Sequence, residues 1–184
     1  MLAQDELAGV VGLHRRVNEG DLGNLPHLRC ITKLVLRLHP PLPLLLQESL
    51  RDCTIGGYTV PRGSRVWINN WAMCRDTALW RADAAAFRPS RFAGEGVDFR
   101  GADFQYLPFG SGRRACPRRS CPGMQLGMFA VELALAELLH CFDWSLPAGT
   151  GPNEIDMDDV FGLTALKAQR LCAVPSPWLS CPLL

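Results

Sequence analysis

Two cysteines, Cys116 and Cys121, lie in the segment FGSGRRACPRRSCPG at residues 109–123, where the pentapeptide RRACP is followed directly by RRSCP. A cysteine that binds iron must be held as the thiolate, protected from oxidation and oriented toward the metal. A cysteine just before a helix gains the first of these, because the helix dipole and free backbone N–H groups stabilise negative charge. Glycines let the backbone approach a flat macrocycle, and arginine pairs with carboxylates at its edge. The segment therefore indicates a haem held by a cysteine thiolate.

A long helix is predicted directly after this loop. Its apolar stripe consists of Met124, Met128, Val131, Leu135, Leu138 and Phe142, at helical spacing. The polar residues Gln125, Glu132 and Glu137 interrupt any membrane span along this stretch. His140, near the end of the helix, is expected to face solvent.

Two further helices are predicted upstream. The first covers residues 2–13, and the second begins at Pro26, because proline fits the first turn of a helix. The second shows apolar residues at helical spacing, namely Leu28, Ile31, Leu34, Val35 and Leu38. The segment HPPLP at 39–43 ends it, since proline cannot continue a helix.

The pattern changes after residue 43. Residues 54–60 and 65–73 are β-rich and are joined by PRGS, so they predict a hairpin. A short helix is expected over 76–85, and 87–110 has no clear period, which predicts a long ordered meander or loop. The tail, 143–184, contains strand-like pieces such as RLCAV. The fold class expected is α+β, mainly helical, in one domain over 1–184 without an internal boundary.

Composition excludes several classes of protein. Hydrophobic residues make up 48% of the 184 residues, which is too many for a disordered chain. The net charge is +1 without a long basic block, so no nucleic-acid partner is expected. The eight cysteines form no CxxC pair, and the N-terminus has no basic, then apolar, signal pattern. We therefore expect reduced thiols, most of them packed as small apolar groups.

FGSGRR and SCPGMQLG together resemble the haem-binding loop of cytochrome P450 monooxygenases, whose pattern is F-x-x-G-x-R-x-C-x-G. LRLHPPLPLLL at 36–46 is similar to the end of the family's K helix and its following strand, and FRPSRF at 87–92 to its P-E-R-F meander motif. Residues 56–76 resemble plant microsomal members. The tail from 156 to 184 looks most like ferulate or coniferaldehyde 5-hydroxylases of lignin synthesis. The resemblance implies the C-terminal half of that fold, with K and L helices, small sheets, meander and cysteine loop.

The resemblance also implies an activity. Haem (iron protoporphyrin IX) would be the cofactor of a monooxygenase that activates dioxygen and hydroxylates a small phenolic phenylpropanoid. Electrons would come from NADPH through a membrane-bound NADPH–cytochrome P450 reductase that docks on the proximal face. Full-length members lie on the cytosolic face of the endoplasmic reticulum membrane, held by an N-terminal anchor that this sequence is not expected to contain.

Each of the two cysteines has half of the family motif. Cys116 follows Phe109, Gly112 and Arg114 at the right spacing, but Arg118 stands where the motif has glycine. By the resemblance, Phe109 shields the thiolate and Arg114 pairs with a haem propionate. If Cys116 is the ligand, the extra residues lie between it and the helix, and Arg118 crowds the macrocycle.

Cys121 has the other half. Arg119 precedes it, Gly123 follows it, and the predicted helix lies directly downstream. We expect Cys121 to be the axial iron ligand, with Cys116 as the alternative, because the helix N-terminus is the main source of thiolate stabilisation. Arg119 then takes the propionate in place of Arg114. That neither cysteine binds haem is a third possibility that the sequence leaves open.

A second departure lies in the K helix. The family has E-x-x-R there, and its glutamate pairs with that arginine and with the arginine of the meander. Here the corresponding residues are Leu34, Arg37 and Arg91. The two arginines are expected to brace the meander as a buried pair of like charges, at a cost of roughly 3–5 kcal/mol, unless Glu48 or another carboxylate substitutes. Leu34→Glu is therefore expected to raise the melting temperature.

A third departure is length, because family chains are more than twice as long. The long helix that carries the oxygen-activating residues is expected to be missing, so no catalytic residue is assigned in this stretch. The alternative function is therefore a truncated, catalytically inactive remnant that at most binds haem.

Overall fold

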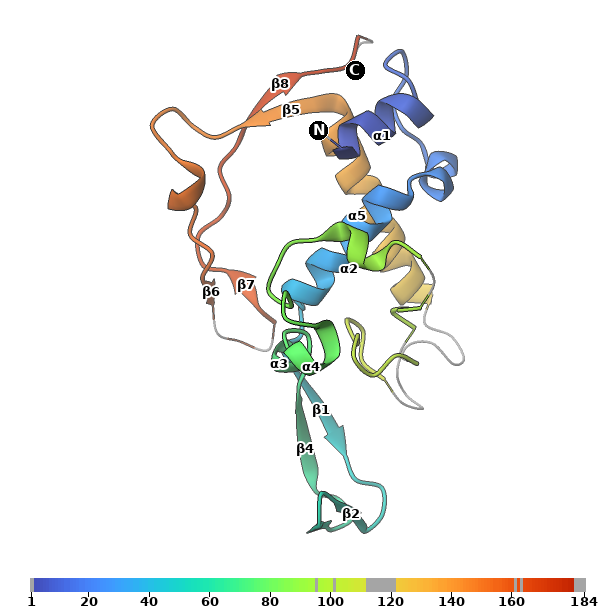
Figure 1. Cartoon of the computed structure of the whole chain (residues 1–184), viewed down its shortest axis with the longest axis vertical. Helices are drawn as coiled ribbons and strands as arrows, with labels where there is room; N and C mark the ends of the chain where they lie inside the picture. The colour runs from blue at the N-terminus through green and yellow to red at the C-terminus, as the bar shows by residue number, and fades with distance from the viewer. Residues whose placement is uncertain are drawn as a thin grey trace.

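Three helices form the centre of the molecule in a computed structural model, which describes residues 2–94, 96–100, 102–111, 122–160, 162 and 164–180. These helices are α1 (Leu2–Val10), α2 (Pro26–Leu38) and α5 (Pro122–Cys141), with the 3-10 turn η1 (Glu19–Asn24) between the first two. Figure 1 shows α1 and α2 packed along α5, with a narrow β arm at one end and the tail looping out to one side. The α+β, mainly helical class is confirmed.

The core between the three helices is apolar. Its buried residues are Leu7, Val11, Val17, Leu22, Leu25, Leu28 and Ala136, and Phe129, Leu133, Leu135 and Leu139 pack against them. Pro26 occupies the first turn of α2, as predicted, and Leu25 provides no side-chain cap. The cap comes from another helix: the carboxylate of Glu6 accepts hydrogen bonds from the backbone N–H groups of His27 (2.7 Å) and Leu28 (2.9 Å).

The predicted apolar stripe of α5 is only partly right. Val131 and Leu138 are about half exposed, whereas Glu132 and His140 are buried. The buried row repeats every four residues and consists of Met124, Met128, Glu132, Ala136 and His140. The prediction for His140 was wrong, because its Nε2 lies 2.8 Å from the carbonyl oxygen of Gly12 and its ring meets Trp178 edge-on.

The buried face of α5 thus includes two polar residues, and both have partners inside the protein. Glu132 forms an ion pair with Arg29 of α2 at 3.5 Å. The stretch Gly123–Cys141 has a mean hydropathy of 1.3 and is long enough to cross a bilayer by length and composition alone. A helix that packs in a protein core passes the same test, and α5 packs against α1 and α2.

The predicted hairpin between residues 54–60 and 65–73 was wrong. Strand β2 (Cys53–Ile55) pairs with β3 (Tyr58–Val60), and Gly56 and Gly57 form the turn with φ of 57° and 84°. Two positive φ angles match the twist of a tight hairpin and favour glycine. Strand β4 (Arg65–Asn69) instead pairs antiparallel with β1 (Leu44–Glu48).

Short helices join this arm to the rest of the chain. The Asn69 side chain accepts a hydrogen bond from the N–H of Ala72 and starts α3 (Asn70–Met73), where a strand had been predicted. The helix expected over 76–85 is confirmed only in its first part, α4 (Thr77–Trp80), which Asp76 caps. The meander contains the 3-10 turn η2 (Pro89–Phe92), which packs against α2.

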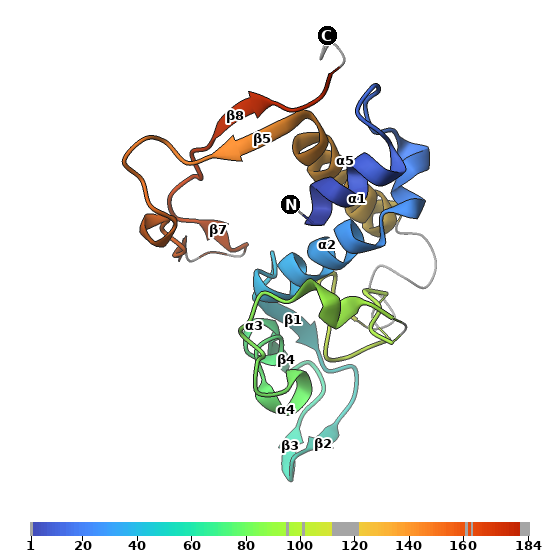
Figure 2. The ribbon, with the colours of Figure 1, turned by 45° about the horizontal axis from the view of Figure 1, so that its top comes forward.

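The tail runs away from α5 and returns to it. Its elements are β5 (Phe142–Ser145), η3 (Pro152–Glu154), β6 (Asp159–Val160), β7 (Leu166–Lys167) and β8 (Val174–Pro177). Strand β5 pairs with β8 and β6 with β7, both antiparallel. Figure 2 shows this loop extending from the end of α5. The strand predicted over RLCAV begins only at Val174.

Candidate haem-binding site

Phe109, the first residue of the predicted haem loop, lies against the start of α5. Its ring meets Phe99 edge-on, with 6.1 Å between the ring centroids. A Cβ atom placed on Gly127 would lie 4.0 Å from Cε1 of Phe109, so this ring reaches the second turn of α5. The chain turns at Gly110, whose φ is +77°. The side chain that the sequence assigns to shielding the thiolate is thus positioned beside the start of α5.

Helix α5 begins where thiolate chemistry requires it. Pro122 is its first residue, so Cys121 directly precedes the helix. Gly123 is exposed in its first turn. The free N–H groups and the positive end of the dipole of a 20-residue helix therefore lie next to the cysteine position. This arrangement fits a haem held by a thiolate. Five other predicted site residues lie outside the described residues: Gly112, Arg114, Cys116, Arg119 and Cys121.

Arg37 is fully buried beneath the segment that leads to the meander. It donates from Nη1 to the carbonyl oxygen of Cys74 (2.5 Å) and from Nη2 to that of Ala84 (2.7 Å). Its guanidinium lies 4.8 Å from the centroid of the Trp80 ring. Arg37 thus fastens α2 to both ends of residues 74–84, and its role in bracing the meander stays a prediction.

Arg91 holds the same segment from the other side. It donates to the carbonyl oxygens of Trp80 (2.8 Å) and Asp83 (2.9 Å), and forms an ion pair with the carboxylate of Asp83 at 3.1 Å. Asp83 also pairs with Arg88 at 2.8 Å. The expected uncompensated pair of arginines is therefore only half right. The carboxylate present is Asp83, whereas Glu48 lies on strand β1 opposite Arg65.

Leu34 occupies the remaining position of the predicted triad. It is fully buried in a cluster with Cys30, Leu38, Trp80, Ala84, Phe92 and Tyr106. In this environment the pKa of Arg37 falls to about 10, first because burial disfavours its charge and then because Arg91 lies nearby. The Nε atoms of both Arg37 and Arg91 are buried and have no hydrogen-bond partner among the described residues.

Sequence reasoning missed an aromatic cluster that supports the approach to the loop. Trp80, Phe92 and Tyr106 contact one another with centroid separations of 5.9, 6.5 and 5.3 Å. The Tyr106 hydroxyl donates to the carbonyl oxygen of Lys33 at 3.0 Å and ties α2 to the chain just before Phe109. These aromatics recur in a stretch without periodicity, so only a contact map could have linked them.

Asn70 was also missed. It is fully buried, and its Nδ2 donates to the carbonyl oxygens of Leu42 (3.2 Å) and Leu107 (3.3 Å). Asn70 therefore joins the segment before β1 to the segment before Phe109. The sequence analysis had placed Asn70 inside the β-rich segment 65–73 and gave it no role.

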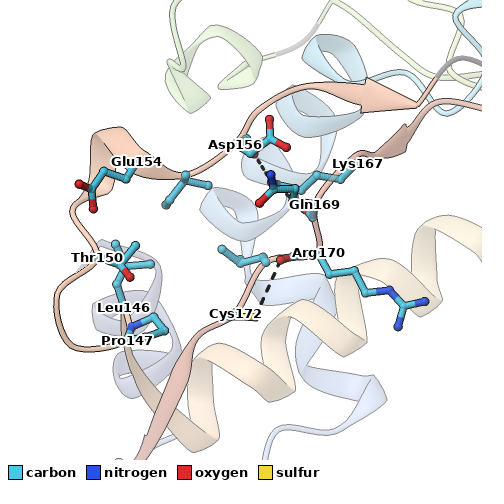
Figure 3. Close-up of a pocket in the computed structure, with 11 residues that line it drawn as sticks. Leu146, Pro147, Thr150, Glu154, Asp156, Lys167, Gln169, Arg170 and Cys172 are labelled. Atoms are coloured by element: carbon cyan, nitrogen blue, oxygen red, sulfur yellow. Dashed lines mark hydrogen bonds between the residues drawn. The ribbon is translucent and has the colours of Figure 1, made fainter.

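A cavity of about 170 Å³ lies in the tail (Figure 3). The charged groups at its wall already hold turns together. The Glu154 carboxylate accepts from the N–H of Gly151 at 2.7 Å, and Lys167 Nζ donates to the carbonyl oxygens of Gln169 (2.9 Å) and Asp156. Figures 1 and 2 place the tail on the opposite side of the molecule from the start of α5, so this cavity is separate from the haem-loop region.

Comparison with solved structures gives the same architecture. A zebra fish cytochrome P450 solved with abiraterone superposes with a TM-score of 0.79 and 29% identity, over 96% of this chain and 39% of that one. A second zebra fish cytochrome P450 structure, solved with progesterone, gives a TM-score of 0.77 at the same identity.

Comparison with curated proteins and with protein families agrees. Cytochrome P450 84A1 of Arabidopsis thaliana is 56% identical over 98% of this chain and 34% of its own length. Geraniol 8-hydroxylase of Catharanthus roseus is 45% identical over 94% of this chain and 34% of its own. The chain thus spans about a third of the length of these relatives. The family model for cytochrome P450 matches residues 2–172, and the chain therefore belongs to the cytochrome P450 family.

Proposed function

We propose that this chain forms the thiolate side of the haem pocket of a monooxygenase. Membership of the cytochrome P450 family implies haem-dependent monooxygenase chemistry. One observation carries the proposal: α5 begins at Pro122, directly after Cys121, and Phe109 packs against the same end of this helix at Gly127. We therefore assign the thiolate side of the haem pocket to the N-terminus of α5, where the cysteine position and the Phe109 ring both lie.

Each residue at this place has a defined task. Cys121, with Cys116 as the alternative, would hold the haem iron through its thiolate, which the first-turn N–H groups of α5 would keep deprotonated. Phe109 excludes water from the thiolate. Arg119, or Arg114 if Cys116 is the ligand, pairs with a haem propionate. The bound haem supplies the redox chemistry that activates dioxygen.

Arg37 and Arg91 act as positioning residues. They hold five backbone and side-chain oxygens of residues 74–84 and so fix the meander that leads to Phe109. We assign them no contact with substrate or cofactor.

For the substrate we propose a small phenolic phenylpropanoid, on the resemblance of residues 156–184 to lignin hydroxylases. Geraniol 8-hydroxylase is also similar over most of the chain, so the proposal depends on the tail and not on the shared core. Electrons would come from NADPH through cytochrome P450 reductase, and the full-length protein would lie at the endoplasmic reticulum membrane.

The alternative is a chain that binds haem but does not hydroxylate. Apolar residues on the outer face of α5, Leu126, Val131 and Leu138, are about half exposed or more. Relatives about three times as long have further segments that can cover such a face. Exposed apolar surface of this kind favours association with more polypeptide or with itself.

The test is a haem titration of the purified chain and of two single variants, Cys121→Ala and Cys116→Ala. We expect Cys121→Ala to lose the thiolate-type absorption spectrum of the ferrous, carbon-monoxide-treated sample, and Cys116→Ala to keep it. The opposite result would move the ligand to Cys116. A thiolate spectrum in both variants would contradict ligation by one defined cysteine.

Activity is tested separately. The haem-loaded chain, NADPH, cytochrome P450 reductase and a phenolic cinnamaldehyde are combined, and hydroxylated product is measured by mass spectrometry. Product above the Cys121→Ala background supports the monooxygenase. Haem binding without product supports the alternative.

A further inference from the structure

The Arg37–Arg91 pair has unused hydrogen-bonding capacity in the protein interior. Arg37 is fully buried, and the Arg91 side chain is only 7% exposed. Their terminal nitrogens donate to carbonyl and carboxylate oxygens of residues 74–84. The Nε–H of each is buried without a partner in the described part of the chain. A buried donor without an acceptor is costly, and more so when it carries charge.

The pair also has too little negative charge around it. Among the described residues, Asp83 is the one carboxylate that pairs with either guanidinium. It also pairs with Arg88, and its side chain is about one-third exposed. The Cys74 thiol lies close to Arg37, but burial raises its pKa to about 11, so it is neutral at physiological pH. Tyr106 is neutral as well, because burial raises its pKa further.

Leu34 lies one turn before Arg37 on the same face of α2. Its side chain belongs to the cluster that contains Trp80, Ala84 and Phe92. The Arg37 guanidinium contacts the Trp80 ring and the carbonyl oxygen of Ala84. A leucine at this point offers methyl groups and no acceptor. The interior of the protein thus has two buried cationic side chains that bind neighbouring oxygens of residues 74–84, and an apolar residue one turn before Arg37 that offers neither of them an acceptor.

We propose that the Arg37–Arg91 pair binds a small monovalent anion, of the chloride or formate class, which accepts the free Nε–H groups and balances the buried charge. The site is independent of haem and of the cysteine loop. Its occupancy would strengthen the attachment of residues 74–84 to α2 and η2. Arginine binds carboxylates and other oxyanions by hydrogen bonding and charge together, and a halide is attracted by the same charge.

The test is the thermal unfolding midpoint of the purified chain at constant ionic strength, with chloride or formate replacing gluconate, which is too bulky to enter the interior. Binding to the folded state alone raises the midpoint by mass action. At about ten times the dissociation constant, we expect a rise of roughly 3–5 °C that saturates with anion concentration. Equal midpoints in chloride, formate and gluconate would overturn the proposal.

Two variants at one position give the control. Leu34→Glu places a carboxylate beside the guanidiniums, so its midpoint should no longer respond to chloride or formate. Leu34→Met keeps an apolar side chain of similar volume and should respond as the wild type does. An equal response in Leu34→Glu would show that the anion acts elsewhere.

Hydrogen exchange provides a second readout that does not depend on any variant. With chloride, amides in residues 74–84 should gain more protection than they do with gluconate, beyond the increase shared by all amides that exchange through global unfolding. No extra slowing in 74–84 over that of α1 would contradict binding at this pair.

Discussion

The helical centre and the β arm both contain large apolar side chains, yet only the helical centre buries most of its own. Leu7, Leu25 and Leu28 are almost fully enclosed between α1, α2 and α5. In the arm, Trp67 is 57% exposed and Tyr58 80% exposed. A two-stranded sheet has one layer and two open faces, so it cannot enclose its own side chains. The helices form a core from their own contacts, whereas the arm presents apolar surface for other polypeptide.

The largest expected loss of stability comes from truncating a leucine in the helical centre, and the same truncation in the β arm is its control. Leu28→Ala removes a fully buried side chain from α2 and should lower the free energy of unfolding by about 2–5 kcal/mol. Leu46→Ala in β1 truncates a side chain that is 49% exposed and should cost less than about 1 kcal/mol. Urea unfolding of the two variants measures both. Equal losses would mean that the arm is packed as tightly as the helices.

A stabilising change is expected at Leu34 of α2, beside the buried arginines. Leu34→Glu gives up roughly 2 kcal/mol of apolar burial and relieves an unpaired buried charge whose cost is roughly 3–5 kcal/mol. The net gain of about 1–3 kcal/mol should raise the melting temperature measured by circular dichroism. Leu34→Gln, which adds an acceptor without charge, is the matched control. A lower melting temperature in Leu34→Glu than in Leu34→Gln would show that Asp83 already balances both arginines.

The helices were more predictable than the strands for a physical reason. The signals for α2 are local: Pro26 at its start, the prolines after Leu38, and apolar residues at helical spacing between them. The helix begins and ends where these signals predict. The pairing of β4 with β1 joins segments separated by a hairpin, and nothing in residues 65–69 specifies that partner. His140 was misplaced because its acceptor, the carbonyl of Gly12, is 128 residues away.

The sequence motif of the candidate site could be predicted, but the residues that hold its segments in place could not. Phe109, Arg37 and Arg91 were identified from spacing and resemblance. The structure places Phe109 beside α5 and the two arginines against residues 74–84, and the roles given to them stay predictions. Asn70 and Tyr106 were missed because each donates to a backbone carbonyl distant in sequence. Asp83 was missed because its ion pairs with Arg88 and Arg91 form only when residues 83–91 fold back on themselves. The assignment of the iron to Cys121 stays a prediction.

A smaller effect is expected where α1 caps α2. Glu6→Ala removes the acceptor for the N–H groups of His27 and Leu28 and should cost about 1 kcal/mol, the usual contribution of a helix N-cap. Asp5→Ala, on the exposed side of α1, removes the same charge without a cap and should change stability by less than about 0.5 kcal/mol. Chemical unfolding of the pair measures the difference. Equal losses would assign the effect to net charge and not to capping.

The smallest expected effect concerns the buried carboxylate of α5 and appears as a pH dependence. Burial raises the pKa of Glu132 above its ordinary value of 4.5, although Arg29 opposes the shift. Because the folded protein holds this proton more tightly than the unfolded chain does, the stability contributed by protonated Glu132 is complete below about pH 4.5 and is lost as the pH rises through the folded-state pKa. Glu132→Gln lacks this titration. The unfolding free energy of the wild type minus that of the variant should therefore decrease as the pH is raised from about 4.5 towards neutral. A difference that stays constant over this range would mean that the ion pair with Arg29 fully offsets burial, and a difference that grows with pH would mean that the ion pair outweighs it.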